Sequence, residues 1–129
     1  MDRKDINPWE WSKAFGFSQA TELTGGERLL LCSGQTAIGP DGAPPTSTDM
    51  GEQIRASLAN LATVLDAAGM TLADVVKLTI FTTDVDALLA DYEGAVEVLA
   101  PNLPAMTLIG VARLAYPELL VEIEAVAAR

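Results

Sequence analysis

The sequence predicts an α+β fold, in which one mixed β-sheet carries two helices on one face in the order ββαβαββ. The length of 129 residues suits one domain. Apolar and β-branched runs recur at strand length, and two segments carry apolar residues at helical spacing. We therefore expect a single domain over residues 1–129, with residues 1–14 as an N-terminal arm.

The first third of the chain predicts an arm, two strands and a loop. The arm is polar and contains Trp9 and Trp11, whose indole rings need cover, either as a lid over a cleft or at a seam between subunits. Residues 17–23 and 28–35 are expected to form a β-hairpin, because a Gly-Gly turn separates them. Residues 39–48 are rich in glycine and proline, which favours a loop.

The central part predicts a helix followed by a strand. Asp49 and Glu52 have the spacing of a capping box, and apolar residues then recur at helical spacing until Gly69: Ile54, Leu58, Leu61 and Leu65. Residues 75–83 are β-branched and alternate, with Lys77, Thr79, Phe81 and Thr83 on one side. This alternation is typical of a strand.

The last third predicts a second helix and two strands. The helix begins at Asp84 or Asp86 and ends before Pro101, with one apolar stripe between them. Residues 107–113 and 119–127 are the remaining strands. Two helices cover only one face of a sheet, yet segments such as Leu29–Cys32 are apolar at consecutive positions, so both faces need burial. We therefore expect the second face to meet other copies of the chain in a homo-oligomer.

Composition excludes several classes of function. Eight basic and eighteen acidic residues give a net charge of −10, which disfavours nucleic acid and anionic membranes as partners. The chain has no histidine and one cysteine, so histidine triads, intramolecular disulfides and paired-cysteine metal sites are impossible. Nothing points to a metal or an organic cofactor. The polar first residues do not look like a signal peptide, so we expect a cytoplasmic protein.

Four segments together resemble the RidA/YjgF family. They are Phe17–Ala20, Ser33–Gln35, a run of matching positions from Asn60 to Thr79, and Val111–Leu114 with Val121–Ala125. The resemblance covers most of the chain in the right order. It implies a chorismate-mutase-like fold and a homotrimer whose inter-subunit clefts bind small carboxylates. In the best-known members it also implies hydrolysis of reactive enamines and imines such as 2-aminoacrylate.

Two substitutions set this chain apart from those members. Met106 stands where the family's Pro-Ala-Arg segment supplies an arginine that holds the substrate carboxylate, and a thioether cannot replace the two charge-assisted hydrogen bonds of a guanidinium. Phe17 replaces the family tyrosine and removes a phenolic donor. We expect a substrate that is less anionic or more aromatic. Arg113 is expected to be structural and to pair with a neighbouring carboxylate.

The resemblance also nominates residues that retain the family pattern. Glu122 matches the family carboxylate that handles water or the leaving amine, and such a carboxylate can serve as general acid or base without histidine. Ser33 and Gly34 are expected to present a hydroxyl and backbone groups to the ligand. Thr107 either donates to the ligand or satisfies only the end of a strand. The alternative is that Glu122 merely pairs with Lys77 or Arg113 across the sheet.

Two hypotheses for the function follow, and a third is kept. The first is an imine or enamine deaminase with Glu122 as acid and base and a substrate different from 2-aminoacrylate. The second is a non-catalytic ligand-binding or regulatory trimer that uses the same inter-subunit cleft. The third is a structural partner acting through its trimer surface. The ribonuclease activity attributed to some family members fits poorly with a charge of −10 and no histidine.

Overall fold

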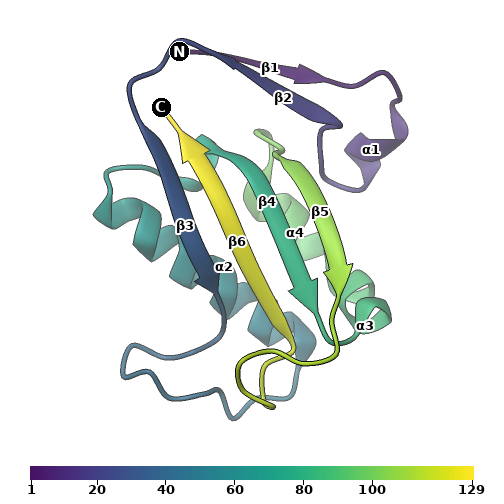
Figure 1. Ribbon diagram of the computed structural model, residues 1–129. Coiled ribbons are helices and arrows are strands. Elements are labelled where there is room, and N and C mark those ends of the chain that lie inside the picture. The colour runs from purple at the N-terminus through teal and green to yellow at the C-terminus, as the bar shows by residue number, and fades with distance from the viewer.

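A four-stranded sheet backed by helices forms the body of the protein. The computed structural model describes residues 1–129. The strand order is β3-β6-β4-β5, and helices cover the far face of the sheet as seen in Figure 1. The strands are β3 (Leu29–Gln35), β4 (Val75–Thr82), β5 (Ala105–Gly110) and β6 (Val121–Ala128).

The sheet is mixed, as predicted. Strand β4 runs parallel to β5 and antiparallel to β6, which in turn is antiparallel to β3. The predicted alternation in β4 is confirmed: Leu78 and Ile80 are buried against the helices, while Lys77, Thr79 and Phe81 lie on the opposite face. The α+β class of the fold is therefore confirmed.

The predicted hairpin between residues 17–23 and 28–35 is wrong. Strand β2 (Ala20–Thr24) pairs with β1 (Asp2–Ile6) in a separate two-stranded sheet, while β3 pairs with β6. The expected arm thus contains a strand and a short helix, α1 (Trp11–Ala14). A Gly-Gly turn signals a change of direction but not which strands pair. The apolar β3 finds its partner in the main sheet, and the more polar β2 finds its partner in the N-terminus.

The long helix α2 (Met50–Ala67) confirms the prediction for this segment. The Asp49 carboxylate accepts a hydrogen bond from the Glu52 N–H at 2.8 Å, which is the expected N-cap. The reciprocal half of the capping box does not form. The Asp49 N–H donates to the Ser47 hydroxyl at 3.1 Å, and that hydroxyl donates to the Glu52 carboxylate.

The second predicted helix is divided in two. Helix α3 (Val85–Ala90) begins at Asp84, whose carboxylate accepts from the Ala87 N–H, and α4 (Glu93–Leu99) follows after a break at residues 91–92. A one-turn 3-10 helix, η1 (Leu72–Asp74), precedes β4. Near the C-terminus, β5 ends at Gly110 rather than at the predicted residue 113.

Helix α2 packs on the sheet through a buried apolar core and one buried amide. Leu61, Leu65, Val75 and Leu78 are at most 1% exposed within this core. The buried Gln53 amide donates to the carbonyls of two loop residues at 2.8 and 2.9 Å and accepts from a third residue's N–H at 2.9 Å: Ser47, Glu118 and Leu120. Gln53 therefore fixes the loop that delivers the chain into β6.

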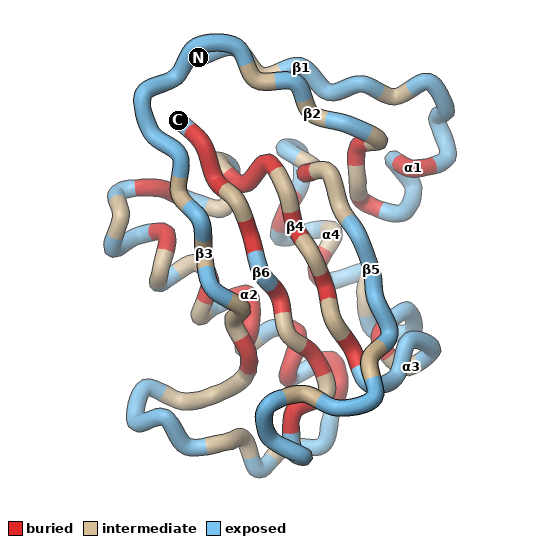
Figure 2. The backbone as a smooth tube through the Cα atoms, viewed as in Figure 1, coloured by how far each residue is buried: buried red, intermediate tan, exposed pale blue.

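The face of the sheet away from the helices has no cover within the chain. Figure 2 shows exposed positions along β3 and β5, and the tube of β6 alternates between buried and partly exposed positions. Leu29 and Leu31 of β3 are 66% and 72% exposed on this face, and Ile109 of β5 is 39% exposed. We call this surface, made by the outward side chains of the four strands, the uncovered face. Its apolar side chains agree with the prediction that both sheet faces need burial.

Candidate functional site

Glu122 lies directly over Gly34 on the uncovered face. The β3–β6 register slips between Cys32 and Gln35, which places an extra residue in β3 and brings Gly34 beside β6. A Cβ atom built on Gly34 would lie 1.9 Å from Oε1 of Glu122. Only glycine therefore leaves room for the carboxylate in this position. The predicted pair Gly34 and Glu122 is brought together by the structure.

The Glu122 carboxylate has no hydrogen-bond or ion-pair partner within the chain, whose two ion pairs are Arg3–Asp5 and Lys13–Glu10. The Lys77 ammonium instead donates to the Thr107 hydroxyl at 2.7 Å. Arg113 lies beyond the end of β5, and its guanidinium donates to two backbone carbonyls of its own loop at 3.1 and 3.3 Å. The alternative pairing of Glu122 with Lys77 or Arg113 is therefore not formed, nor is the expected carboxylate partner of Arg113.

Met106 lies on the other face of the sheet from Glu122. In the β4–β5 register Met106 is paired with the buried Leu78, whereas Thr107 is paired with Thr79 on the uncovered face. In the β4–β6 register Glu122 is paired with Phe81, which also belongs to the uncovered face. Within one chain, Met106 thus points toward the helices, and Thr107 and Glu122 point away from them.

Met106 and Phe17 line a pocket between the helices and the N-terminal segment. The pocket has a volume of about 290 Å³, and all nine lining residues are hydrophobic: Trp11, Phe15, Phe17, Ile80, Leu88, Leu89, Tyr92, Met106 and Leu108. The Tyr92 hydroxyl donates to the Met106 sulfur at 2.8 Å. Burial raises the pKa of Tyr92 to about 12, so its hydroxyl stays protonated at neutral pH. We call this cavity the apolar pocket.

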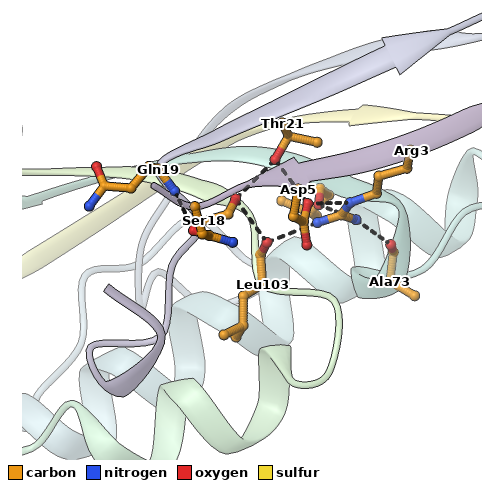
Figure 3. A network of polar contacts seen from close by, with 9 residues as sticks. Arg3, Asp5, Ser18, Gln19, Thr21, Ala73 and Leu103 are labelled. Carbon is orange, nitrogen blue, oxygen red and sulfur yellow. Dashed lines mark hydrogen bonds and ion pairs between the residues drawn. The ribbon is translucent and has the colours of Figure 1, made fainter. Parts of the chain in front are cut away.

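A network of polar contacts fastens the N-terminal segment beside the apolar pocket (Figure 3). The Arg3 guanidinium donates to the carbonyls of Ala73, Val75 and Leu103 at 3.0–3.2 Å. The Ser18 N–H donates to the Pro104 carbonyl at 3.0 Å. These bonds tie β1 and the segment before β2 to η1, to the first residue of β4 and to the residues just before β5.

The turn between α1 and β2 approaches α4 closely. Gly16 has φ of +80°, and a Cβ atom there would lie 2.6 Å from a methyl group of Val96. The aromatic side chains of this segment are therefore held against the body of the protein. Trp11 and Phe15 form a fixed wall of the apolar pocket.

Comparison with known proteins identifies the family. The family described as Endoribonuclease L-PSP matches residues 11–129. A RutC family protein of Haemophilus influenzae is 41% identical over 118 residues, covering 88% of this chain and 86% of the relative. The chain belongs to the RidA/YjgF family. The 2-iminobutanoate/2-iminopropanoate deaminase of Escherichia coli K12 is 34% identical to it over 105 residues, covering 78% of this chain and 80% of the relative.

A solved structure shows that the fold is shared along the whole chain. The crystal structure of the Rid family protein YyfB from Yersinia pestis, described as a protein of unknown function, superimposes with a TM-score of 0.90. The two chains are 39% identical, and the match covers 100% of each. The fold of this RidA-family chain therefore agrees with the resemblance read from its motifs.

Two other nominated residues lie on the same face of the sheet as Glu122. Ser33 is exposed, and Thr107 accepts from Lys77 on the uncovered face. Cys32 packs against the core, and burial raises the pKa of its thiol, which keeps the sulfur protonated and unreactive.

No group of three or more His, Cys, Asp and Glu side chains is arranged to hold a metal ion. No helix combines the length and the apolar character needed to span a membrane.

Sequence reasoning assigned three of the pocket residues differently. Trp11 was expected as a lid over a cleft or at a seam between subunits, Leu89 belonged to the apolar stripe of the second predicted helix, and Phe15 carried no assignment. Their shared signal was weak, because each is an apolar residue at a position that is about half exposed. Tyr92 packs against the core and also lines the pocket. The six nominated residues thus divide into two sets. One set lies on the uncovered face (Glu122, Gly34, Ser33 and Thr107), and the other lines the apolar pocket (Phe17 and Met106).

Proposed function

We propose that this RidA-family protein hydrolyses C=N bonds of imines or enamines in a cleft between copies of the chain. The observation that carries the proposal is the Glu122 carboxylate, which lies over Gly34 with no partner and is therefore free to act on a ligand. The naming of the Escherichia coli relative as an imine deaminase supports the reaction class. The charge and the lack of histidine still disfavour ribonuclease chemistry.

The division of the site supports a location between subunits. Glu122 and the apolar pocket lie on opposite faces of one sheet, so a ligand bound to a single chain cannot touch both. We propose that copies associate through the uncovered face, which carries the exposed Leu29 and Leu31, and that Glu122 of one copy then faces the pocket of the next. The homotrimer that the family resemblance implies is the assembly proposed for this arrangement.

The reaction balances with water as the only co-substrate. The Glu122 carboxylate takes a proton from water while the water oxygen bonds to the imine carbon. The protonated Glu122 then delivers that proton to nitrogen, which gives a carbinolamine. Glu122 next takes the proton of the carbinolamine hydroxyl and passes it to nitrogen as the carbon–nitrogen bond breaks, so that ammonia leaves and a carbonyl compound remains. Met106 offers no cation for a substrate carboxylate, so the preferred imine differs from 2-aminoacrylate.

The test measures ammonia release from imines generated in place by amine and amino-acid oxidases. Glu122→Gln should lower the rate by about 10²-fold or more without changing sedimentation, because it removes the acid and base but not the fold. Glu124→Gln is the matched control, since Glu124 lies two residues away on the same strand and face and is exposed. Failure of the wild-type protein to accelerate ammonia release from any imine of the panel would refute the proposal.

Met106→Arg tests whether the shift in substrate depends on this one position. Restoring the guanidinium should create activity on 2-aminoacrylate if the rest of the cleft retains the family arrangement. The second hypothesis, a non-catalytic ligand-binding trimer, is favoured by the wholly apolar lining of the pocket. It would be supported if apolar ligands raise the melting temperature and neither the wild type nor Met106→Arg turns over any imine.

A further inference from the structure

The aromatic side chains of the N-terminal segment meet in one geometry. The ring of Trp11 lies edge-to-face against Phe15, with centroids 6.1 Å apart, and against Phe17, with centroids 5.7 Å apart. The interplanar angles are 76° and 77°. This is the arrangement that aromatic rings prefer, because the positive edge of one ring meets the negative face of another. The three rings form one wall, which we call the aromatic wall.

Contacts within the chain hold the backbone segment that carries the wall. Arg3 and Ser18 tie its flanking strands to the body, and Gly16 lets the turn after α1 lie against Val96. Trp11 and Phe15 nevertheless remain 55% and 57% exposed. A fixed ring with a free surface offers a ligand a contact that costs little side-chain entropy.

Met106 adds a further contact suited to an aromatic ring. It lines the pocket together with Tyr92, whose hydroxyl donates to the Met106 sulfur, and thioethers make favourable contacts with aromatic rings. No charged side chain lines the pocket. Its volume of about 290 Å³ is at the lower end of ligand pockets, which suits a single ring with a short chain.

We infer that the aromatic wall, through Trp11 and Phe15, selects imines that carry an aryl group on a short alkyl chain. This inference rests on the proposed function for its chemistry and names the substrate class of that site. The aryl ring enters the apolar pocket, and the C=N group remains at its mouth, toward the Glu122 that a neighbouring copy supplies. Oxidation of a primary arylalkylamine to its imine is the class of reaction that would produce such a substrate.

Binding is tested with ketones that resemble the product and contain no C=N bond. The probes are 4-phenyl-2-butanone and, as its match without the ring, 2-butanone. Trp9→Phe leaves Trp11 as the only tryptophan, because the chain contains two, so the fluorescence of this variant reports on the wall. The phenyl ketone should change the Trp11 emission and bind at least tenfold more tightly than 2-butanone.

Calorimetry on variants then assigns the contact. Trp11→Ala and Phe15→Ala should each weaken binding of the phenyl ketone about twofold to tenfold, the range expected for loss of one aromatic contact. Trp9→Ala is the matched control, because Trp9 is similarly exposed at 58% but does not line the pocket. Its affinity should be unchanged. Arg3→Ala, which loosens the anchor of the wall, should weaken phenyl ketone binding while Lys4→Ala does not.

The outcomes separate this inference from the proposed function. Equal affinity for the two ketones, or equal losses in Trp9→Ala and Trp11→Ala, would overturn it. A Trp11 emission that changes on dilution of the protein but not with the phenyl ketone would also overturn it, because the wall would then be covered by a second copy. Imine turnover without aryl preference refutes only the inference. Aryl binding without any turnover refutes only the proposed reaction, and the Glu122→Gln variant should retain that binding.

Discussion

Replacing Gly34 with alanine is expected to displace the Glu122 carboxylate and leave the fold intact. The added Cβ atom would lie 1.9 Å from Oε1, 2.7 Å from Cδ and 2.9 Å from Cγ of Glu122. Comfortable contacts between such atoms are about 3.5 Å or longer, so the side chain must move by more than an ångström. The Glu122 side chain is flexible and half-buried, so it can move aside into a strained rotamer. We therefore expect the free energy of unfolding to fall by only about 1 kcal/mol.

Stability and turnover should therefore respond differently to Gly34→Ala. The melting temperature should fall by only a few degrees, as about 1 kcal/mol implies for a chain of this size. Imine turnover should fall about 10²-fold, since a misplacement of about 1 Å at a reacting group has effects of that order. The assays are thermal unfolding and ammonia release with the imine panel.

The matched control is Gly94→Ala. Gly94 lies within helix α4, and a Cβ atom there would have no neighbour within 4 Å. This variant should keep full turnover and gain up to about 1 kcal/mol of stability from helix propensity. If Gly34→Ala turned over imines as fast as Gly94→Ala, the placement of Glu122 over Gly34 would have no part in catalysis, and the reasoning would be refuted.

Three further predictions concern stability and assembly. Gln53→Leu should lower the free energy of unfolding by about 3 kcal/mol in urea titrations, because it leaves three buried backbone groups without partners; an unchanged midpoint would contradict this. The pKa of Tyr92 is raised from 10.0 to about 12, so the unfolded state loses its proton first. The free energy of unfolding should thus decline by up to about 3 kcal/mol between pH ~10 and ~12, and the decline should be smaller in the Tyr92→Phe variant. Leu31→Asp should abolish self-association in sedimentation, whereas Val98→Asp, half-exposed on α4, should not; a wild-type monomer would refute the predicted assembly.

Local sequence signals predicted where helices and strands form better than they predicted which strands pair. The N-cap at Asp49 and the apolar spacing after it predicted α2, because capping and helical periodicity depend only on neighbours in sequence. The alternation in residues 75–82 predicted both faces of β4 for the same reason. The hairpin failed because strand pairing is a long-range choice, and β1 supplied a competing partner for β2.

The arrangement of the nominated residues was not predicted. The motifs nominated Glu122, Gly34, Met106 and Phe17, and the structure places Glu122 against Gly34 on the uncovered face and Met106 and Phe17 in the lining of the apolar pocket. Their division between two faces could not be predicted, because the side that a strand residue takes depends on register and on where bulges fall. The bulge near Gly34 is such a case.

The sequence alone determined the strand and helix periodicities, the surplus of apolar strand residues, the net charge of −10, and the family motifs. All of these are properties of composition or of near neighbours. The tertiary structure alone decided that Glu122 meets Gly34, that Met106 turns toward Tyr92, and that Trp11 completes a pocket. Each of these contacts joins segments far apart in sequence, and only the packing of the whole chain brings them together.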